Sequence, residues 1–408
     1  MRRLAAYATP SAVLVVTCLL AGAFKLHCGA VWTGAIQYTT GCYSDAVPFW
    51  GLRGVAAGEL PYFQTRLEYP VLTGALIWLE GLATRLLWGT RADAQGFLAV
   101  VTAVNALLAF WVLDMMERAG APRWRQYAWA AGPPLVLYLG HNWDMLAIAL
   151  AAAAFLAAAR RQERRATALA AFGTAAKLFP VLLLPLLGLA ALFRRGKGWR
   201  ARFVTAAALV AVAMLAWGAV NLPVALAAPE NWSEFYTFSK DRAGTAASIW
   251  EIAGAQGWTL LAQADRNLWS FLLFAAGAAA IVAIGWRRHQ GHLWFLFPAV
   301  LAWFLLTNKV WSPQFDLWLW PFLVLTVRRP WLLAWFAVAD IACYFGEFWW
   351  FARLEGAWFG TTPTHIALAA ALRAGALFWV IAEALLRQPP NWMLQSNRTS
   401  ENAAALPR

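Results

Sequence analysis

Charged side chains are scarce in this sequence: only 13% of its 408 residues are Asp, Glu, Lys or Arg, whereas 62% are hydrophobic. A water-soluble domain of this length does not need so much apolar surface, and no polar stretch is long enough to fold alone. Apolar runs close to the roughly 20 residues that cross a bilayer recur along the chain. The sequence therefore predicts one all-α polytopic membrane domain over residues 1–387 and a disordered cytoplasmic tail over 388–408.

Several sequence motifs are missing as well. There is no Walker A motif, Rossmann glycine pattern, HExxH or GxSxG, so no nucleotide fold and no common hydrolase site is indicated. The four cysteines lack metal-ligand spacing, and no metal site is predicted from them. A bridge between Cys28 and Cys42 is allowed near the outer face, but two free thiols are the preferred expectation.

The net charge of +13 is compatible with nucleic-acid binding, but no RNA-binding signature or helix-turn-helix spacing is present. Instead, the Lys and Arg residues form short clusters between apolar runs, as the positive-inside rule predicts for cytoplasmic connections. This rule gives about 12 crossings of the plasma membrane with both termini inside. The predicted spans are 9–26, 96–116, 127–139, 144–159, 166–176, 180–193, 203–220, 268–286, 293–306, 315–327, 331–345 and 364–386.

The segment 70–88 is apolar enough to cross too, but a crossing there would put every later basic cluster outside. We therefore expect it to lie along the outer surface as an amphipathic helix, where Glu80 and Arg85 are less costly than at the bilayer centre. The longer polar connections then face outward, and the inner ones are short and basic. Chemistry is expected at the extracytoplasmic face.

Three acidic side chains fall in these outer connections. Asp45 can act as a general base, or can cap a helix over 46–58. Glu68 can be a second acid, or a solvated residue before a helix that starts at Pro70. Asp144 can bind substrate or cap the span that it begins. Together the three acids could hold a divalent cation through oxygen ligands, although they have no local ligand spacing.

Isolated basic residues in the same connections suit a phosphate group. Lys177 interrupts an Ala/Leu run and can neutralise a phosphate or extend to the lipid headgroups. Lys309 and Arg53 are further donor-phosphate candidates, with Lys240 and Arg242 as weaker ones because loop charges are usually solvated. The remaining candidates are assigned to substrate binding, and His365 can alternatively cap the last span. They are Tyr43, Tyr69, His141, Asn142, Asn308, Gln314 and His365.

An ordered set of motifs resembles the bacterial polyprenyl-phosphate-sugar transferases of glycosyltransferase family 87, which belong to the GT-C class. The similarity covers about residues 1–386. The motifs are Cys42-Tyr43-Ser44-Asp45, Glu68-Tyr69-Pro70-Val71-Leu72-Thr73-Gly74, Asn142-Trp143-Asp144, Lys177-Leu178-Phe179-Pro180 and Lys309-Val310-Trp311-Ser312-Pro313-Gln314.

The resemblance implies a GT-C-like bundle with two juxtamembrane helices in the first outer loop, at about 46–58 and 70–88. It implies that Asp45 is the catalytic carboxylate and that the donor is a polyprenyl-phosphate sugar, commonly mannose in actinobacterial members. The acceptor would be a lipid or glycan of the cell envelope. Many class members carry paired acids in this loop, whereas Ser44 and Ala46 flank Asp45 here. A requirement for a divalent cation is therefore left open.

The expected reaction is direct inverting transfer, in which Asp45 removes a proton from the acceptor hydroxyl. Lys177, Lys309 and Arg53 would stabilise the departing polyprenyl phosphate. Polar residues among the helices would serve a non-enzymatic transporter, lipid-handling protein or scaffold for envelope precursors equally well. Transporters often contain inverted repeats, and none is visible in this sequence.

Overall fold

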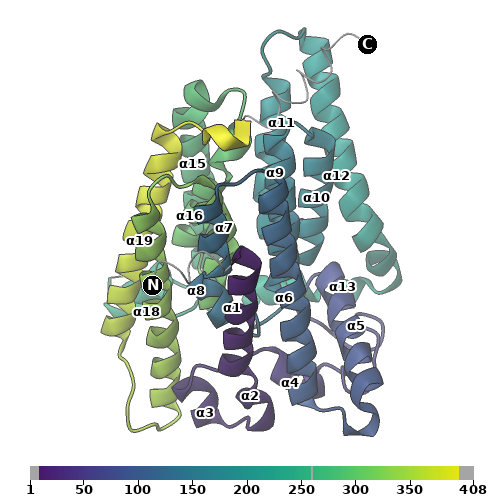
Figure 1. Ribbon diagram of the computed structural model, residues 1–408, viewed down its shortest axis with the longest axis vertical. Coiled ribbons are helices and arrows are strands. Elements are labelled where there is room, and N and C mark those ends of the chain that lie inside the picture. The colour runs from purple at the N-terminus through teal and green to yellow at the C-terminus, as the bar shows by residue number, and fades with distance from the viewer. Residues whose placement is uncertain (1–8, 259–260, 395–408) are drawn as a thin grey trace.

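The computed structural model describes residues 9–258 and 261–394, and within these ranges the chain is built from helices (Figure 1). The first half contains α1 (Pro10–Lys25), α2 (His27–Ala30), α3 (Gly34–Thr39), α4 (Ala46–Leu52), α5 (Val71–Trp88), α6 (Ala94–Arg118), α7 (Arg123–Ala130), α8 (Pro133–Tyr138), α9 (Asp144–Ala159), α10 (Glu163–Ala176) and α11 (Leu183–Leu192). The second half contains α12 (Trp199–Ala227), α13 (Pro229–Asp241), α14 (Ile249–Ala255), α15 (Gln263–His289), α16 (Phe297–Thr307), α17 (Asp316–Thr326), α18 (Pro330–Leu354) and α19 (Pro363–Leu386). Short 3-10 turns at Phe179–Leu182, Leu293–Leu296 and Pro313–Phe315 precede α11, α16 and α17.

Seven helices in the described ranges are long and apolar enough to cross a membrane: α1 with α2, α5, α6, α12, α15, α18 and α19. Shorter apolar helices over 144–159, 179–192 and 293–307 pack among them. Every span predicted from the sequence is helical, which confirms the expectation of an all-α multi-pass membrane protein. One predicted span, 127–139, is divided into α7 and α8, because Gly132 and the Pro133-Pro134 pair interrupt helical hydrogen bonding.

The segment between α1 and α6 stays at one end of the bundle. Figure 1 places α2, α3, α4 and α5 together at the end where α6 begins. By length and composition alone α5 resembles a membrane span, yet it starts beside the end of α10, where the Thr73 hydroxyl donates to the Ala176 carbonyl at 2.7 Å. This arrangement is compatible with the prediction that 70–88 remains on the outer side.

The first predicted juxtamembrane helix is shorter than expected. The sequence predicts it over 46–58, but α4 ends at Leu52. Gly54 and Gly58 adopt φ values of +65° and +79°, which a right-handed helix cannot contain. The prediction also misses α13 and α14, which lie in the polar stretch 221–267 that is expected to be an outer loop.

The preferred expectation of free thiols at Cys28 and Cys42 is wrong. The two residues form a disulfide with a Cα–Cα distance of 5.7 Å, within the usual range for such bonds. Helices α2 and α3 fold the chain back on itself, so that Cys42 returns to Cys28. Sequence alone does not show this return, because the intervening residues carry no hairpin signal.

Removal of this disulfide is expected to lower the free energy of unfolding by about 3 kcal/mol, the chain-entropy value for a loop of this length. The variant is Cys28→Ser/Cys42→Ser, and the measurement is thermal unfolding in detergent. Cys18→Ser is the matched control, because Cys18 is unpaired. A double variant as stable as the control would contradict the expectation.

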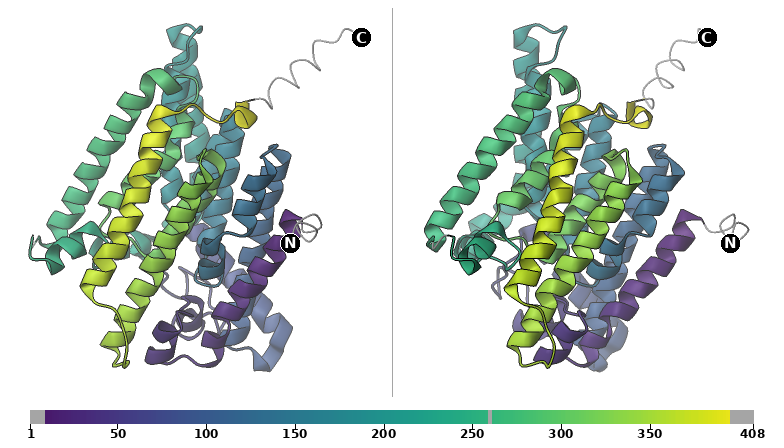
Figure 2. Two further views of the ribbon diagram at one scale, coloured as in Figure 1. Left: turned by 60° about the vertical axis from the view of Figure 1, so that its left-hand side comes forward. Right: turned by 90° about the vertical axis from the view of Figure 1, so that its left-hand side faces the viewer.

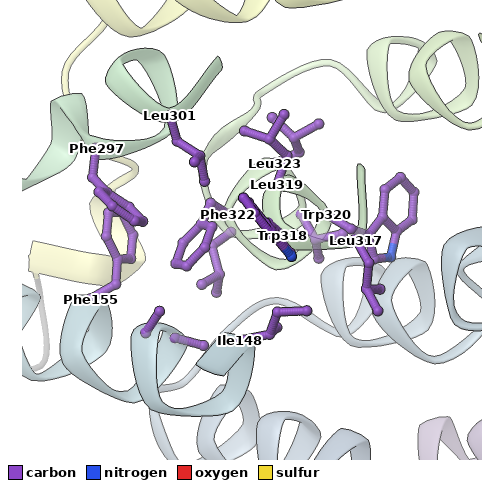
Figure 3. Packing of buried hydrophobic residues seen from close by; sticks show 14 of the residues in the cluster. Ile148, Phe155, Phe297, Leu301, Leu317, Trp318, Leu319, Trp320, Phe322 and Leu323 are labelled. Atoms are coloured by element: carbon purple, nitrogen blue, oxygen red, sulfur yellow. The ribbon is translucent and has the colours of Figure 1, made fainter. Parts of the chain in front are cut away.

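The core is formed where α9, α16 and α17 meet (Figure 3). The rings of Phe155 and Phe297 both contact Phe322, with centroids 5.4 and 4.8 Å away. Alanines cover most of α9, and these small side chains allow α6, α10 and α17 to pack closely around it. This central helix carries Asp144 at its first position and so fixes one wall of the site described below.

The last helices form a hairpin: Figure 2 shows α18 and α19 running side by side along the bundle. The residues that follow are predicted from the sequence to be a disordered tail. Residues 388–394 instead contact the bundle, with Met393 only 2% exposed and the Gln388 amide donating to the Arg288 carbonyl. The rest of the predicted tail, 395–408, lies outside the described residues.

Candidate active site

A cavity of about 600 Å³ lies where several of the predicted outer connections meet. The ends of α10, α13 and α16 and the segment before α4 form its walls. Most of the predicted site residues line it, although they come from distant parts of the chain. They are Asp45, Glu68, Lys177, Lys309, Tyr43, Tyr69, His141, Asn308 and Gln314.

Asp45 is half-buried at the base of this cavity. Its backbone N–H donates to the His141 carbonyl at 2.8 Å, and the Tyr69 hydroxyl donates to its Oδ2 at 2.8 Å. Its side chain does not cap α4; the Ser44 hydroxyl accepts from the Ala46 N–H instead, at 3.2 Å. The capping interpretation is therefore wrong, and the carboxylate is available to the cavity.

Burial raises the pKa of the Asp45 carboxyl above its usual range. The hydrogen bond from Tyr69 and the positive charge of Lys177 oppose this shift and keep it limited. The negative charge of Asp45 in turn raises the pKa of the Tyr43 hydroxyl well above its usual range, so that both neighbouring phenols stay protonated as donors. A carboxylate with a raised pKa is better suited to accept a proton than an ordinary surface aspartate.

Lys177 is a cation whose charge acts on this carboxylate. Its Nζ forms an ion pair with Asp144 Oδ1 at 2.7 Å and lies 4.6 Å from the centre of the Tyr69 ring. The second Asp144 oxygen accepts from the Trp318 indole at 2.7 Å. Asp144 therefore does not cap α9; the Asn142 side chain accepts from its backbone N–H. Asn142 and Asp144 lie behind the cavity wall and support Lys177.

Lys309 and Arg242 bring two more positive charges to the cavity lining. Lys309 Nζ donates to the carbonyls of Lys240 and Arg242 at 2.6 and 2.9 Å, which fixes the end of α13 over the cavity. The Arg242 guanidinium stacks 5.4 Å from the Phe238 ring and has no hydrogen-bond or ion-pair partner among the described residues. Burial lowers the pKa of both groups; no carboxylate among the described residues forms an ion pair with either, although the charges of Asp45 and Asp241 act on Arg242 and Lys309. Sequence reasoning ranks Arg242 low because it cannot show that this loop charge is enclosed.

Besides Asn142 and Asp144, two further predicted site residues do not line the cavity. Arg53 forms a bidentate pair with Glu68 at 2.8 Å and faces away from the cavity lining. His365 is exposed, and its ring completes a capping box with Thr362 at the start of α19, as the alternative interpretation expected. Glu68 remains on the cavity wall with its charge balanced by Arg53.

The three acids do not form a common ligand set for a cation. Asp45 is hydrogen-bonded to Tyr69, Glu68 is paired with Arg53, and Asp144 is paired with Lys177. In residues 9–258 and 261–394, no group of three or more His, Cys, Asp and Glu side chains is placed to hold a metal ion. The hypothesis of a divalent cation held by these acids is therefore not supported.

Lys25 is a residue that sequence reasoning misses. It is fully buried at the end of α1 and donates to the carbonyls of Gly41 and Tyr43 at 3.1 and 2.8 Å. It also contacts the Tyr344 hydroxyl and lies 3.4 Å from His141 Nδ1. The available signal is a lone lysine ending an apolar span. Lys25 orders the segment that leads directly into Asp45.

A second missed feature is a buried ion pair behind the 308–316 loop. Arg373 of α19 donates to Asp316 Oδ2 at 3.0 Å, and both side chains are fully buried. The Trp311 indole donates to the other Asp316 oxygen at 3.0 Å and lies against the guanidinium, 3.6 Å from the ring centre. Trp311 is part of the loop that carries Lys309 and Gln314, so this pair positions that wall of the cavity.

No protein-family model and no curated protein sequence matches the chain. Among the solved structures similar to the chain are two crystal structures of ArnT from Cupriavidus metallidurans, one in the apo state and one bound to undecaprenyl phosphate. The first has a TM-score of 0.41 at 14% identity and covers 86% of this chain and 72% of that one. The second has a TM-score of 0.45 at 14% identity and covers 97% and 78%. A similarity this remote does not assign a family or an activity, so the resemblance to family 87 stays a prediction.

Proposed function

We propose that this chain is a membrane glycosyltransferase that moves a sugar from a polyprenyl-phosphate donor to a hydroxyl of a cell-envelope lipid or glycan. The observation that carries the proposal is the placement of Asp45, a half-buried carboxylate that faces a cavity also lined by Lys177 and Arg242. A base and cations that line the same cavity are what transfer from a phosphate-activated sugar requires. The motif resemblance supplies the sugar, which we propose to be mannose.

The donor phosphate is assigned to the basic side chains that line the cavity. Lys177 already balances Asp144, whereas the charge of Arg242 is unpaired within the described chain. A guanidinium can hold a phosphate through two parallel hydrogen bonds, so Arg242 is the main phosphate ligand in this proposal. Lys177 and Lys309 complete the positive field, and Arg53 has no part in it. Asn308 and Gln314 are assigned to sugar hydroxyls.

The reaction is a single displacement at the anomeric carbon. Asp45 takes the proton of the acceptor hydroxyl, and the acceptor oxygen forms a bond to the anomeric carbon. The bond from that carbon to the phosphate oxygen breaks, and the polyprenyl phosphate leaves with the electron pair. Because attack and departure occur on opposite faces, the anomeric configuration inverts. Tyr69, which donates to Asp45 Oδ2, fixes the orientation of the carboxylate.

The experiment is an assay of the purified full-length protein in liposomes with a panel of polyprenyl-phosphate sugars. We expect one donor to be consumed, with polyprenyl phosphate and a glycosylated acceptor as products. If the lipid-linked sugars only moved between leaflets without covalent change, the protein would be a transporter and the proposal would be wrong.

Arg242→Gln is expected to raise the KM for the donor about 10- to 100-fold. The reason is that a hydrogen bond to a charged group contributes about 1.5–3 kcal/mol, and this substitution removes one. The measurement is the initial rate against donor concentration. Lys240→Gln removes a neighbouring charge that is exposed and does not line the cavity, so its KM should stay near that of the wild type. If both substitutions raised the donor KM equally, the effect would reflect a general loss of positive charge near the cavity and not a specific contact between Arg242 and the phosphate.

The pH dependence of kcat/KM should follow Asp45. The base must be deprotonated, so the rate falls as pH decreases through its pKa. Because burial raises that pKa, the acid limb should lie above the value of about 3.9 that is usual for Asp. A profile measured with donor below KM tests this expectation. An acid limb at the ordinary aspartate value would contradict it.

A further inference from the structure

A second cavity lies at the other end of α9 from the proposed active site. Helix α9 begins at Asp144, beside Lys177, and its 16 residues place its far end about 24 Å away at 1.5 Å per residue. The second cavity has a volume of about 140 Å³ and lies between the ends of α6 and α9 and the start of α10. It shares no lining residue with the first cavity, so it is a separate site.

The polar side of this cavity is strongly basic. Arg118 of α6, Arg160 after α9 and Arg165 of α10 line it, together with one carboxylate, Asp114. Asp114 accepts only from Arg118 Nε, at 2.9 Å, which leaves the terminal nitrogens of that guanidinium without a carboxylate. Arg160 donates to the Arg118 carbonyl, and Arg165 donates to the Gln162 amide oxygen at 3.3 Å. The lining therefore has an excess of positive charge.

The rest of the cavity lining is apolar and continues onto the exposed surface of α6. Met115, Leu156 and Leu169 line the cavity beside the arginines. Trp111 also lines it and is 38% exposed, and Leu107 lies one turn further along the same helix with 69% exposure. Indole rings commonly lie at the level of lipid headgroups. A free phosphate ion would not need this apolar wall, whereas an acyl chain would.

We propose that this cavity binds the phosphate of an anionic phospholipid. The guanidinium groups of Arg118, Arg160 and Arg165 hold the phosphate, and one acyl chain lies along Met115, Trp111 and Leu107. Arginine suits this role because its planar group matches a phosphate with paired hydrogen bonds. The arginines come from three helices, so the bound lipid ties the ends of α6, α9 and α10 together. The site is independent of the proposed transferase activity.

Native mass spectrometry of the full-length protein in detergent tests the site, with phosphatidylglycerol and phosphatidylcholine as probes. We expect the wild type to retain phosphatidylglycerol in preference to phosphatidylcholine. Arg118→Gln/Arg160→Gln/Arg165→Gln should lower the apparent affinity for phosphatidylglycerol by at least about tenfold, since each basic residue near an anionic lipid contributes roughly 1 kcal/mol. Thermal unfolding of the same variant checks that it folds.

The matched control removes the same amount of charge from arginines outside the cavity: Arg195→Gln/Arg287→Gln/Arg329→Gln. This variant should retain phosphatidylglycerol like the wild type. If both triple variants lost the lipid equally, the binding would be general attraction to a basic surface and the site would be refuted. Retention by the cavity variant would refute it as well.

If inorganic phosphate displaced the lipid fully, the ligand would be a soluble phosphate and the lipid assignment would be wrong. Where the cavity variant does not fold, Arg165→Gln alone is compared with Arg195→Gln, and equal retention of the lipid by these two overturns the proposal.

Discussion

Asp45→Asn is expected to lower the rate of sugar transfer about 10²- to 10⁴-fold, because a general base usually contributes a factor of this size. The amide has the same shape and can still accept the hydrogen bond from Tyr69, but it cannot take a proton from the acceptor. Donor binding should change less than turnover, because the proposed phosphate ligands are Arg242, Lys177 and Lys309 and not Asp45. The effect should therefore appear in kcat, measured as the initial rate at saturating donor.

The same change should not destabilise the fold. The pKa of Asp45 is raised in the folded protein, so the folded state binds this proton more tightly than the unfolded chain. Stability from this group is present below the unfolded-state pKa and is lost as pH rises through the folded-state pKa, so above it the charged carboxylate is unfavourable to folding. The Asn variant has no such loss, so its Tm should equal or exceed that of the wild type.

Asp241→Asn is the matched control for this variant, because Asp241 ends α13 near the cavity but is exposed and does not line it. Its turnover should stay close to the wild-type value. Near-normal turnover by Asp45→Asn would remove Asp45 from the mechanism. A large loss accompanied by a lower Tm would point to a structural role instead.

Arg373→Met is expected to lower the free energy of unfolding by about 3–5 kcal/mol, the cost of leaving a buried charge without its partner. Asp316 is fully buried, and no other cation among the described residues forms an ion pair with it. Asp340 is buried on α18, where its carboxyl accepts from the Tyr138 hydroxyl, so it offers Asp316 no compensating positive charge. The measurement is chemical or thermal unfolding in detergent, and the loss should be among the largest for any single substitution in this chain.

A double variant provides the control. Asp316→Asn/Arg373→Met removes both charges and keeps an amide near the Trp311 indole, so most of the lost stability should return. If the double variant is as unstable as Arg373→Met, the loss comes from packing of the guanidinium against Trp311 and not from the unpaired carboxylate. In either variant, movement of the 308–316 loop should raise the donor KM.

The sequence is sufficient to predict the spans and the convergence of the main site residues. Apolar runs and basic clusters together decide which connections share an end of the bundle, and they predict that Asp45, Lys177 and Lys309 lie at the same end. The three residues do line one cavity. The alternation of apolar runs and basic clusters allows this prediction, because the side of the membrane on which a connection lies depends on composition and not on contact distances.

Pairing across the bundle cannot be predicted in the same way. Lys177–Asp144 and Arg373–Asp316 are set by distances between elements that are remote in sequence, and Arg53–Glu68 by the irregular loop between α4 and α5. His365 and Arg53 are residue types that commonly bind substrates, yet local hydrogen bonds hold both side chains away from the cavity. Helix α13 escapes prediction because most of its residues are polar, and α14 because its 7 residues are too few to give a clear apolar period.

The disulfide between Cys28 and Cys42 lies three positions before Asp45 in the chain. A newly made chain has reduced thiols in the cytosol, and they become oxidised only after this segment has been translocated to an oxidising compartment. On the predicted topology, maturation of the catalytic end is thus tied to correct insertion. A copy inserted with the opposite orientation would keep both thiols reduced and would lack the crosslink that anchors this part of the chain.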